Sequence, residues 1–135
     1  MIAPRLSRRE FLALSWLAIS GTRGPWLQRA GPHPKPRPGI DASHVLTEDQ
    51  LKGKDVIAAF NEVRQIPQVV DGIRCQCGCA KRDGYYSLLS CFEGPHAMAQ
   101  ACEMCQGEGR HAFRLHSSGK SLDEIRSAIE ERFGS

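Results

Sequence analysis

The chain has 135 residues, 41% of them hydrophobic and 7% aromatic, and its formal net charge is +3. This length suits one small domain. The charge is uneven, because residues 1–30 hold five arginines and one glutamate, while the rest of the chain carries 13 basic and 14 acidic side chains. A nearly neutral remainder with few aromatic rings offers neither the basic surface nor the stacking platform of a nucleic-acid-binding protein. We therefore expect no nucleic-acid partner.

Residues 1–30 have the layout of an export signal. Two adjacent arginines, Arg8 and Arg9, directly precede a short apolar stretch from Phe11 to Ile19, and a basic segment before a short apolar one is typical of such signals. The arginine pair resembles the twin-arginine class, which predicts a periplasmic or other extracytoplasmic protein. A basic amphipathic helix or an uncleaved anchor is the alternative. No apolar run reaches the roughly 20 residues of a membrane-spanning helix, so no stable membrane span is expected after the signal is cleaved.

A twin-arginine route has a consequence for the cysteines, because it exports proteins that have already folded. Folding would then take place in the reducing cytoplasm, where structural disulfides rarely persist. The chain has six cysteines, and a small domain that folds before export needs another cross-link. A bound metal ion supplies one.

Proline alternates with other residues between Gly31 and Gly39. Because proline fixes φ and removes an amide donor, residues 31–43 are predicted to form an extended linker without a core. His33 in this linker could contact a metal but is expected to be solvated. The cysteine-rich domain is predicted to span residues 44–135, a length that commonly relies on metal or disulfide cross-links.

The first predicted helix of this domain lies before the cysteines. It begins at a capping box, residues 47–50, and continues through apolar residues at helical spacing between residues 56 and 66. Gly53 weakens its early part, and Pro67 ends it. A short apolar turn at residues 69–73 then leads into the cysteines.

Two further helices are predicted in the C-terminal part of the domain. Residues 101–115 form the first, weakened by Gly107 and Gly109. A second capping box at residues 121–124 starts the last helix, and Gly134 stops it. The apolar face of this helix consists of Leu122, Ile125, Ile129 and Phe133. With no alternating strand pattern, the fold class is a small all-α domain of three to four helices with a cysteine-rich loop.

The six cysteines form a C-x-C-x-C group, a single residue and a C-x-x-C pair: Cys75, Cys77 and Cys79, then Cys91, then Cys102 and Cys105. Cysteines two residues apart do not easily form a disulfide with one another, but they readily present their sulfurs to one metal ion. Gly78 can adopt positive φ, which lets the backbone wrap around a centre. A C-x-x-C pair at a helix start favours thiolates. Two sulfur clusters about 25 residues apart thus have ordinary spacing for a metal chelate.

Thiolate-rich sites select zinc, copper(I) or an iron–sulfur cluster. His96, Met98 and Met104 lie among the cysteines, and a thioether beside thiolates favours copper. We predict copper or zinc, with a cluster less favoured, and the predicted metal-binding residues are Cys75, Cys77, Cys79, Cys91, His96, Cys102 and Cys105. Alternatively, His96 is an exposed loop residue and both methionines fill the core. The cysteines themselves could instead form three disulfides after export or perform thiol redox chemistry.

Six segments between residues 56 and 134 carry a family resemblance: Ile73-Arg74-Cys75-Gln76-Cys77-Gly78-Cys79, Ser90-Cys91-Phe92, Pro95-His96-Ala97, Cys102-Glu103-Met104-Cys105, Gly119-Lys120-Ser121 and Glu124-Ile125-Arg126. They resemble a bacterial family named for its Pro-Cys-Tyr-Cys-Gly-Cys motif, the PCYCGC-motif proteins. Arg74 stands where the family has proline, Gln76 replaces its tyrosine, and residues 81–86 lie where its members carry histidines. The resemblance implies export and a cysteine-defined site, and it implies no particular reaction.

A fainter resemblance, mostly over residues 119–134, is to the small helical thiol reductases of cytochrome c maturation. It implies an alternative in which the protein is a thiol–disulfide oxidoreductase. Cys102 would then be the nucleophile, because it lies nearer the presumed helix start, and Cys105 would resolve the mixed disulfide.

The leading hypothesis is an exported, non-enzymatic metal-binding protein of the cell envelope. It would be a copper or zinc carrier or buffer, with a protein partner in metal transfer. The alternatives are the oxidoreductase and a disulfide-stapled interaction module. Hydrolytic chemistry finds little support, because the sequence has no nucleophile elbow, phosphate loop or dinucleotide fingerprint.

Overall fold

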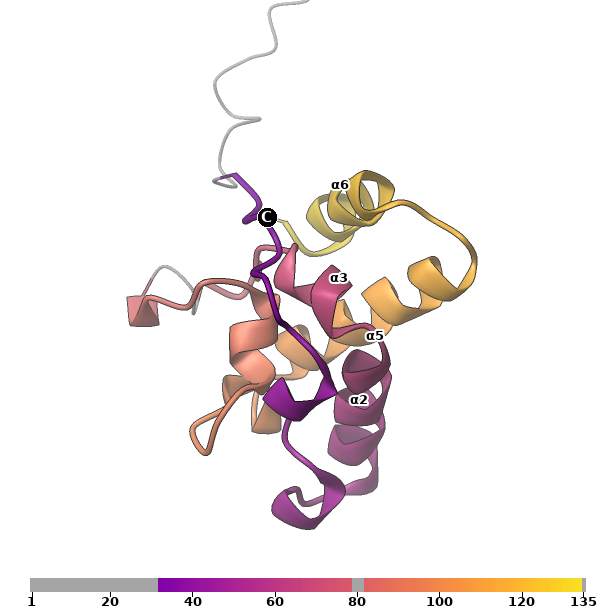
Figure 1. Ribbon diagram of the computed structural model, residues 1–135. Coiled ribbons are helices and arrows are strands. Elements are labelled where there is room, and N and C mark those ends of the chain that lie inside the picture. Colours follow the sequence, from indigo (N-terminus) through magenta and orange to yellow (C-terminus); the bar gives the residue numbers. More distant parts are fainter. Residues whose placement is uncertain (1–31, 79–81, 135) are drawn as a thin grey trace, which may run out of the picture.

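The structure, a computed structural model, describes residues 32–78 and 82–134, and this part of the chain is helical without strands (Figure 1). The predicted class, a small all-α domain with a cysteine-rich loop, is confirmed. The predicted export signal and Cys79 lie outside the described residues. The α-helices are α2 (Lys54–Gln65), α3 (Pro67–Asp71), α5 (Glu103–Ser117) and α6 (Leu122–Phe133). The 3₁₀ turns are η2 (Ala42–His44), η3 (Glu48–Gln50), η4 (Leu88–Phe92) and η5 (Met98–Gln100).

The predicted first helix is divided at Gly53. This residue has a φ of +94°, a conformation that residues with side chains rarely adopt, so the helix does not run through it. The capping box stabilises η3 instead, where the Gln50 side-chain oxygen accepts the Thr47 amide at 3.0 Å. Pro67 follows α2, as predicted, and is also the first residue of α3. A proline fits there because the first amide of a helix has no partner within the helix.

Helix α5 packs against both α2 and α6 (Figure 1). Its approach to α2 is close at Gly109, where a Cβ would lie 2.7 Å from Val63 Cγ2 and 3.0 Å from Phe92 Cζ. The Phe92 ring in turn packs edge-to-face on Phe60, with 4.8 Å between the ring centroids, an arrangement that aromatic pairs prefer. Gly109 made the helix prediction weaker, but its lack of a side chain is what allows α5 to pack closely against α2.

The Gly109→Ala variant is expected to unfold with a free energy lower by about 1–2 kcal/mol, because overpacking exceeds the gain in helix propensity. Urea unfolding of the reduced chain measures this. Gly107→Ala is the matched control, since its Cβ would meet only Phe133, at 3.3 Å from Cε1. That variant is expected to be neutral or more stable by up to about 1 kcal/mol. Equal effects of the two substitutions would contradict the packing argument.

The C-terminal helix begins as predicted. The Ser121 hydroxyl accepts the Glu124 amide at 3.2 Å, and the Glu124 carboxylate accepts the Ser121 amide at 2.7 Å. This reciprocal pair satisfies two amides at the start of α6. Ile125 and Ile129, on the predicted apolar face, are fully buried. The α5–α6 hairpin therefore follows from local sequence signals.

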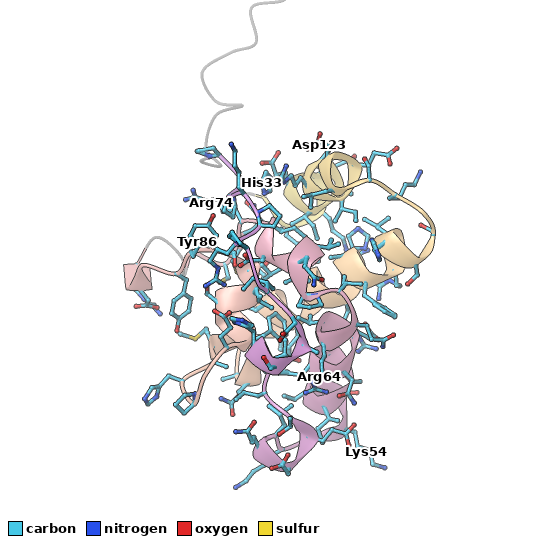
Figure 2. The ribbon with its side chains drawn as sticks, in the orientation of Figure 1. His33, Lys54, Arg64, Arg74, Tyr86 and Asp123 are labelled. Atoms are coloured by element: carbon cyan, nitrogen blue, oxygen red, sulfur yellow. The ribbon has the colours of Figure 1, made fainter. Side chains whose placement is uncertain are left out.

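The Pro-rich segment lies along the domain from Pro32 to Ile40 instead of extending away from it (Figure 1). The His33 side chain is 12% exposed and pairs through Nε2 with Glu130 at 2.8 Å. Its Nδ1 accepts the Arg74 amide at 3.0 Å, and Figure 2 shows the two residues on the same face. The expectation that His33 is solvated is therefore wrong, because partners distant in sequence surround the ring.

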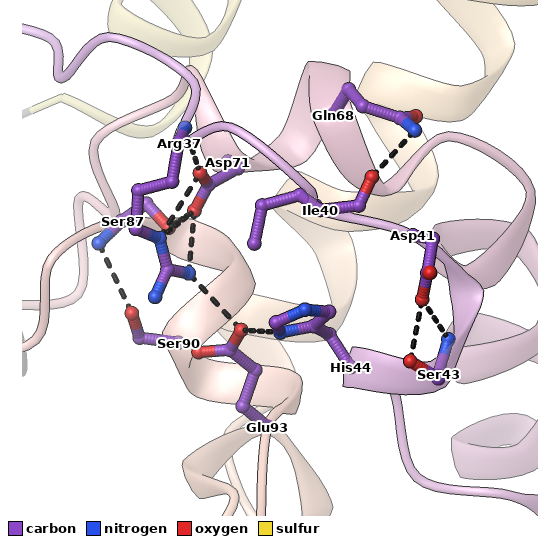
Figure 3. Close-up of polar contacts among 10 residues, drawn as sticks. All are labelled: Arg37, Ile40, Asp41, Ser43, His44, Gln68, Asp71, Ser87, Ser90 and Glu93. Carbon is purple, nitrogen blue, oxygen red and sulfur yellow. Dashed lines mark hydrogen bonds and ion pairs between the residues drawn. The ribbon is translucent and has the colours of Figure 1, made fainter.

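Arg37 holds the same segment to the domain (Figure 3). Its guanidinium donates to both oxygens of Asp71, with 2.7 Å from Nη2 to Oδ1, and donates to Glu93 at 3.0 Å. The Arg37 amide and the Ser87 hydroxyl also donate to Asp71, each at 2.6 Å. Burial raises the pKa of Asp71, but these hydrogen bonds outweigh burial and hold it below its usual range. Arg37 thereby links α3 to the end of η4, the two elements that flank the loop with the first cysteines.

Candidate metal centre

Three segments bring cysteines to one place. The loop after α3 carries Cys75 and Cys77, η4 carries Cys91, and the first turn of α5 carries Cys105. A backbone hydrogen bond of 2.7 Å ties the start of this loop to the start of η4. The cysteines therefore meet through tertiary packing of segments that are distant in sequence.

The sulfur atoms of these four cysteines form a compact cluster, called here the four-sulfur group, in which all lie within 4.8 Å of one another. Cys75 Sγ lies 3.0 Å from Cys77 Sγ and 3.6 Å from Cys105 Sγ. Cys105 Sγ lies 3.4 Å from Cys77 Sγ. A tetrahedral site with zinc–sulfur bonds of about 2.3 Å places its sulfurs about 3.8 Å apart. The group therefore has the size and donor type to hold a metal ion.

The four-sulfur group is buried on most sides. Cys91 and Cys105 are 0% exposed and Cys75 is 3% exposed, whereas Cys77 is half-buried. The three buried cysteines belong to the apolar core of the domain. A metal ion held there would have three ligands fixed by core packing, and solvent would reach it at Cys77.

A buried glutamate, Glu108, adjoins the group and was not anticipated from the sequence. Its side chain is 0% exposed. Glu108 Oε1 accepts the Gln76 amide at 2.7 Å, and Oε2 lies 3.1 Å from Cys75 Sγ. The available signal was its spacing, because residues three apart on a helix share a face, so Glu108 follows Cys105 toward the sulfurs. Glu108 thus holds the backbone of the cysteine loop as well as touching a sulfur.

Protons are shared unevenly across the group. Hydrogen bonds from Cys105 and Cys91 lower the pKa of Cys75 to about 2. The hydrogen bond to Cys75 raises the pKa of Cys105. For Cys91, the hydrogen bond with Cys105 lowers the pKa. The hydrogen bond with Cys75 and burial have the opposite effect and are together larger, so the pKa of Cys91 is raised. A metal ion must displace the protons of the neutral thiols, so metal affinity is expected to rise with pH.

Burial, and then the negative charge of Cys75, raise the pKa of Glu108 to about 10. A protonated carboxyl at this position donates its hydrogen bond to the Cys75 thiolate. Because the pKa is about 10 in the folded chain against 4.5 for an ordinary glutamate, the folded state holds a proton that the unfolded state releases. The lowered pKa of Cys75 acts in the opposite direction, so it is the contribution of Glu108 to the stability of the metal-free chain that is expected to fall as pH rises from 4.5 toward 10.

Glu108→Gln is expected to remove this pH dependence, because glutamine stays neutral and keeps a similar shape. The metal-free variant should gain in free energy of unfolding over the wild type as pH rises from about 5 to about 8. Urea unfolding in the presence of a reductant and a chelator measures the difference at each pH. Glu103→Gln, exposed in the same helix, is the control and should follow the wild-type profile. Parallel profiles for Glu108→Gln and the wild type would show that Glu108 is ionised in the folded chain.

Of the predicted site residues that the structure describes, Cys102 and His96 lie outside the four-sulfur group. Cys102 is half-buried at the N-cap of α5, where its sulfur accepts the Cys105 amide at 3.4 Å. His96 is exposed, Met104 is 42% exposed, and Met98 packs against the core. The five cysteines in the described part of the chain form no disulfide. The structure therefore brings together part of the predicted ligand set and places these residues outside it.

Comparison of the chain with protein-family models, with curated proteins and with solved structures finds no match. In the part of the chain that the structure describes, every helix is too short or too polar to cross a membrane. The chemistry of the site therefore has to be inferred from the four-sulfur group and its surroundings.

Proposed function

We propose that the protein binds a soft metal ion, Zn(II) or Cu(I), and acts as a carrier or buffer of that metal in the cell envelope. The observation that supports this is the four-sulfur group, formed by Cys75, Cys77, Cys91 and Cys105 within 4.8 Å. Thiolates select these metals over harder cations. A domain this small buries only a modest core and gains stability from such a site.

The donor set favours Zn(II) as the first candidate. Four cysteine ligands around one ion are typical of zinc sites without catalytic water. Met104 is exposed and Met98 packs in the core, so the thioether argument for copper rests on the sequence alone. Cu(I) remains the second candidate because it also prefers thiolates.

The proposed location rests on the sequence of residues 1–30. Arg8 and Arg9 before a short apolar stretch favour export by the twin-arginine route. That route suits a domain whose metal is bound before export, because the cytoplasm keeps the thiols reduced. The resemblance to PCYCGC-motif proteins supports the same location. A fusion of residues 1–30 to a reporter, with Arg8→Lys and Arg9→Lys as the control, tests export directly.

Metal content and thiol reactivity of the full-length chain test metal binding. The chain would be purified anaerobically and analysed for zinc and copper, and its thiols titrated before and after chelation. About one equivalent of metal per chain, with the buried thiols reactive only after chelation, is the expected result. A chain that remains metal-free when supplied with both metals under reducing conditions would exclude the proposal.

One observation favours the oxidoreductase as a second candidate. Cys102 lies at the N-cap of α5 and its sulfur accepts an amide hydrogen bond, and the first cysteine of a C-x-x-C pair at a helix start is the usual nucleophile of thiol–disulfide oxidoreductases. Disulfide exchange with a small disulfide substrate distinguishes this function from metal binding. Full exchange activity of Cys102→Ser would exclude Cys102 as the nucleophile.

A further inference from the structure

The described part of the chain holds one more thiol at the site than a tetrahedral metal ion uses. Five cysteines there form no disulfide, and four of them make up the four-sulfur group. The fifth, Cys102, lies beside the group, because its sulfur accepts the amide of Cys105 at 3.4 Å and the Cys105 sulfur belongs to the group. A surplus thiol of this kind is not needed to fill a closed four-coordinate site.

Exposure separates these five thiols into two kinds. Cys75, Cys91 and Cys105 are buried, whereas Cys77 and Cys102 are half-buried. The Cys77 sulfur lies 3.4 Å from that of Cys105, and Cys102 lies against the amide of the same residue. The two half-buried thiols therefore both lie beside Cys105, at the start of α5.

We propose that Cys102 is an exchange ligand, which takes the place of Cys77 on the metal ion during transfer to an acceptor. This rests on the proposed metal-binding function. Cys75, Cys91 and Cys105 hold the ion throughout, and the fourth position alternates between the two half-buried thiols. When Cys102 occupies that position, the Cys77 side chain no longer covers the metal ion. An acceptor thiol or a chelator can then reach the ion from the side of Cys77.

The exchange balances without an oxidant or reductant. When the Cys102 sulfur takes the fourth position on the metal ion, its thiol proton would pass to a base in solvent. The bond from the metal to Cys77 then breaks, and the Cys77 sulfur takes a proton from solvent. The oxidation state and total coordination number are the same before and after.

A competing explanation is that Cys102 serves only as a helix cap. The Cys102→Ser variant separates the two roles, because a serine hydroxyl at the N-cap also accepts an amide hydrogen bond but is a poor ligand for a soft metal. Ser121→Ala is the matched control, since it removes the cap of α6 and leaves every thiol in place. A purely structural role for Cys102 predicts no effect of Cys102→Ser on metal transfer.

The test is the rate of Zn(II) transfer from the loaded full-length chain to the chromophoric chelator 4-(2-pyridylazo)resorcinol. For Cys102→Ser we expect unchanged stoichiometry and an affinity within about threefold of the wild type. The transfer rate is expected to fall at least about tenfold. Ser121→Ala should transfer zinc at the wild-type rate. An unchanged rate for Cys102→Ser would overturn the proposal.

A double-mutant cycle in affinity gives a second readout. Cys77→Ser should keep stoichiometric zinc binding, because Cys102 replaces the lost ligand, while Cys77→Ser with Cys102→Ser should bind at least about 100-fold more weakly. The cycle is carried out in a Cys79→Ser background, so that this third thiol cannot substitute. Loss of stoichiometric binding in Cys102→Ser alone would make it a resident ligand and overturn the exchange role. A wild-type chain that takes up neither Zn(II) nor Cu(I) would overturn the proposed function itself, and the exchange role with it.

Discussion

Saturation of the four-sulfur group with Zn(II), at about a thousand times its dissociation constant, is expected to raise the free energy of unfolding by about 4 kcal/mol. The physical reason is that the site is assembled only when the loop after α3, η4 and α5 pack together, so the unfolded chain binds the ion more weakly. For a domain of this size the unfolding temperature should rise by at least about 15 °C. Thermal unfolding of the reduced full-length chain, with and without Zn(II), measures the shift.

Cys91→Ser should abolish most of this stabilisation, because Cys91 is 0% exposed and belongs to the four-sulfur group. A hydroxyl at that position is a weak ligand for a soft metal. Met104→Ala is the matched control, since its side chain is exposed and outside the group, and it should retain the full shift. An equal zinc-dependent shift in Cys91→Ser and the wild type would mean that zinc is bound elsewhere.

Local sequence signals were sufficient to predict a helix whose first and last residues carry capping signals. The capping box at Ser121 predicted α6, and its buried face, Ile125 and Ile129, followed from helical spacing. The start of α2 was less accurate, because a capping box at Thr47 stabilises a 3₁₀ turn and the positive φ of Gly53 interrupts the helix. A capping box identifies a helical turn, but the length of the helix depends on the residues that come after the box.

The four-sulfur group was only partly predictable, because cysteine spacing does not show which thiols meet. C-x-C-x-C and C-x-x-C both indicated metal binding, yet the structure joins the first two cysteines of one motif to the second of the other and to Cys91. Cys102 is directed to the N-cap of α5 instead. Which thiol of each motif faces inward is decided by the packing of α5 and η4, which no local pattern specifies.

Two polar contributions come from long-range contacts that were not predicted from the sequence. Glu108 is buried against Cys75, although glutamate is rarely buried. The Pro-rich segment was expected to be an extended linker without a core, and the structure shows that it has partners far along the chain: Arg37 bonds Asp71, at a separation of 34 residues. Composition identified the segment as extended, and only the folded domain determines where an extended segment lies.

Arg37→Ala is expected to lower the free energy of unfolding at neutral pH by about 2–3 kcal/mol, which is less than the full cost of breaking a buried ion pair. The Asp71 carboxylate is 0% exposed, while the Arg37 side chain is 34% exposed, so solvent screens part of the interaction. The Arg37 amide and the Ser87 hydroxyl continue to donate to the carboxylate in this variant. Lys35→Ala, an exposed change in the same segment, is the control and should stay within about 0.5 kcal/mol of the wild type.

The pH dependence distinguishes this ion pair from simple loss of packing. The pKa of Asp71 is held below its usual range in the folded chain, so the unfolded state binds more protons and the stabilisation is present above the unfolded pKa of about 3.9. As pH falls through the folded pKa, the carboxylate is protonated and that stabilisation is lost. The difference between wild type and Arg37→Ala should therefore stay constant above about pH 5 and shrink between about pH 5 and about pH 2, as measured by urea unfolding at each pH. A difference that stays constant over this range would mean that Arg37 acts through its aliphatic packing, because the apolar part of the side chain does not respond to the protonation of Asp71.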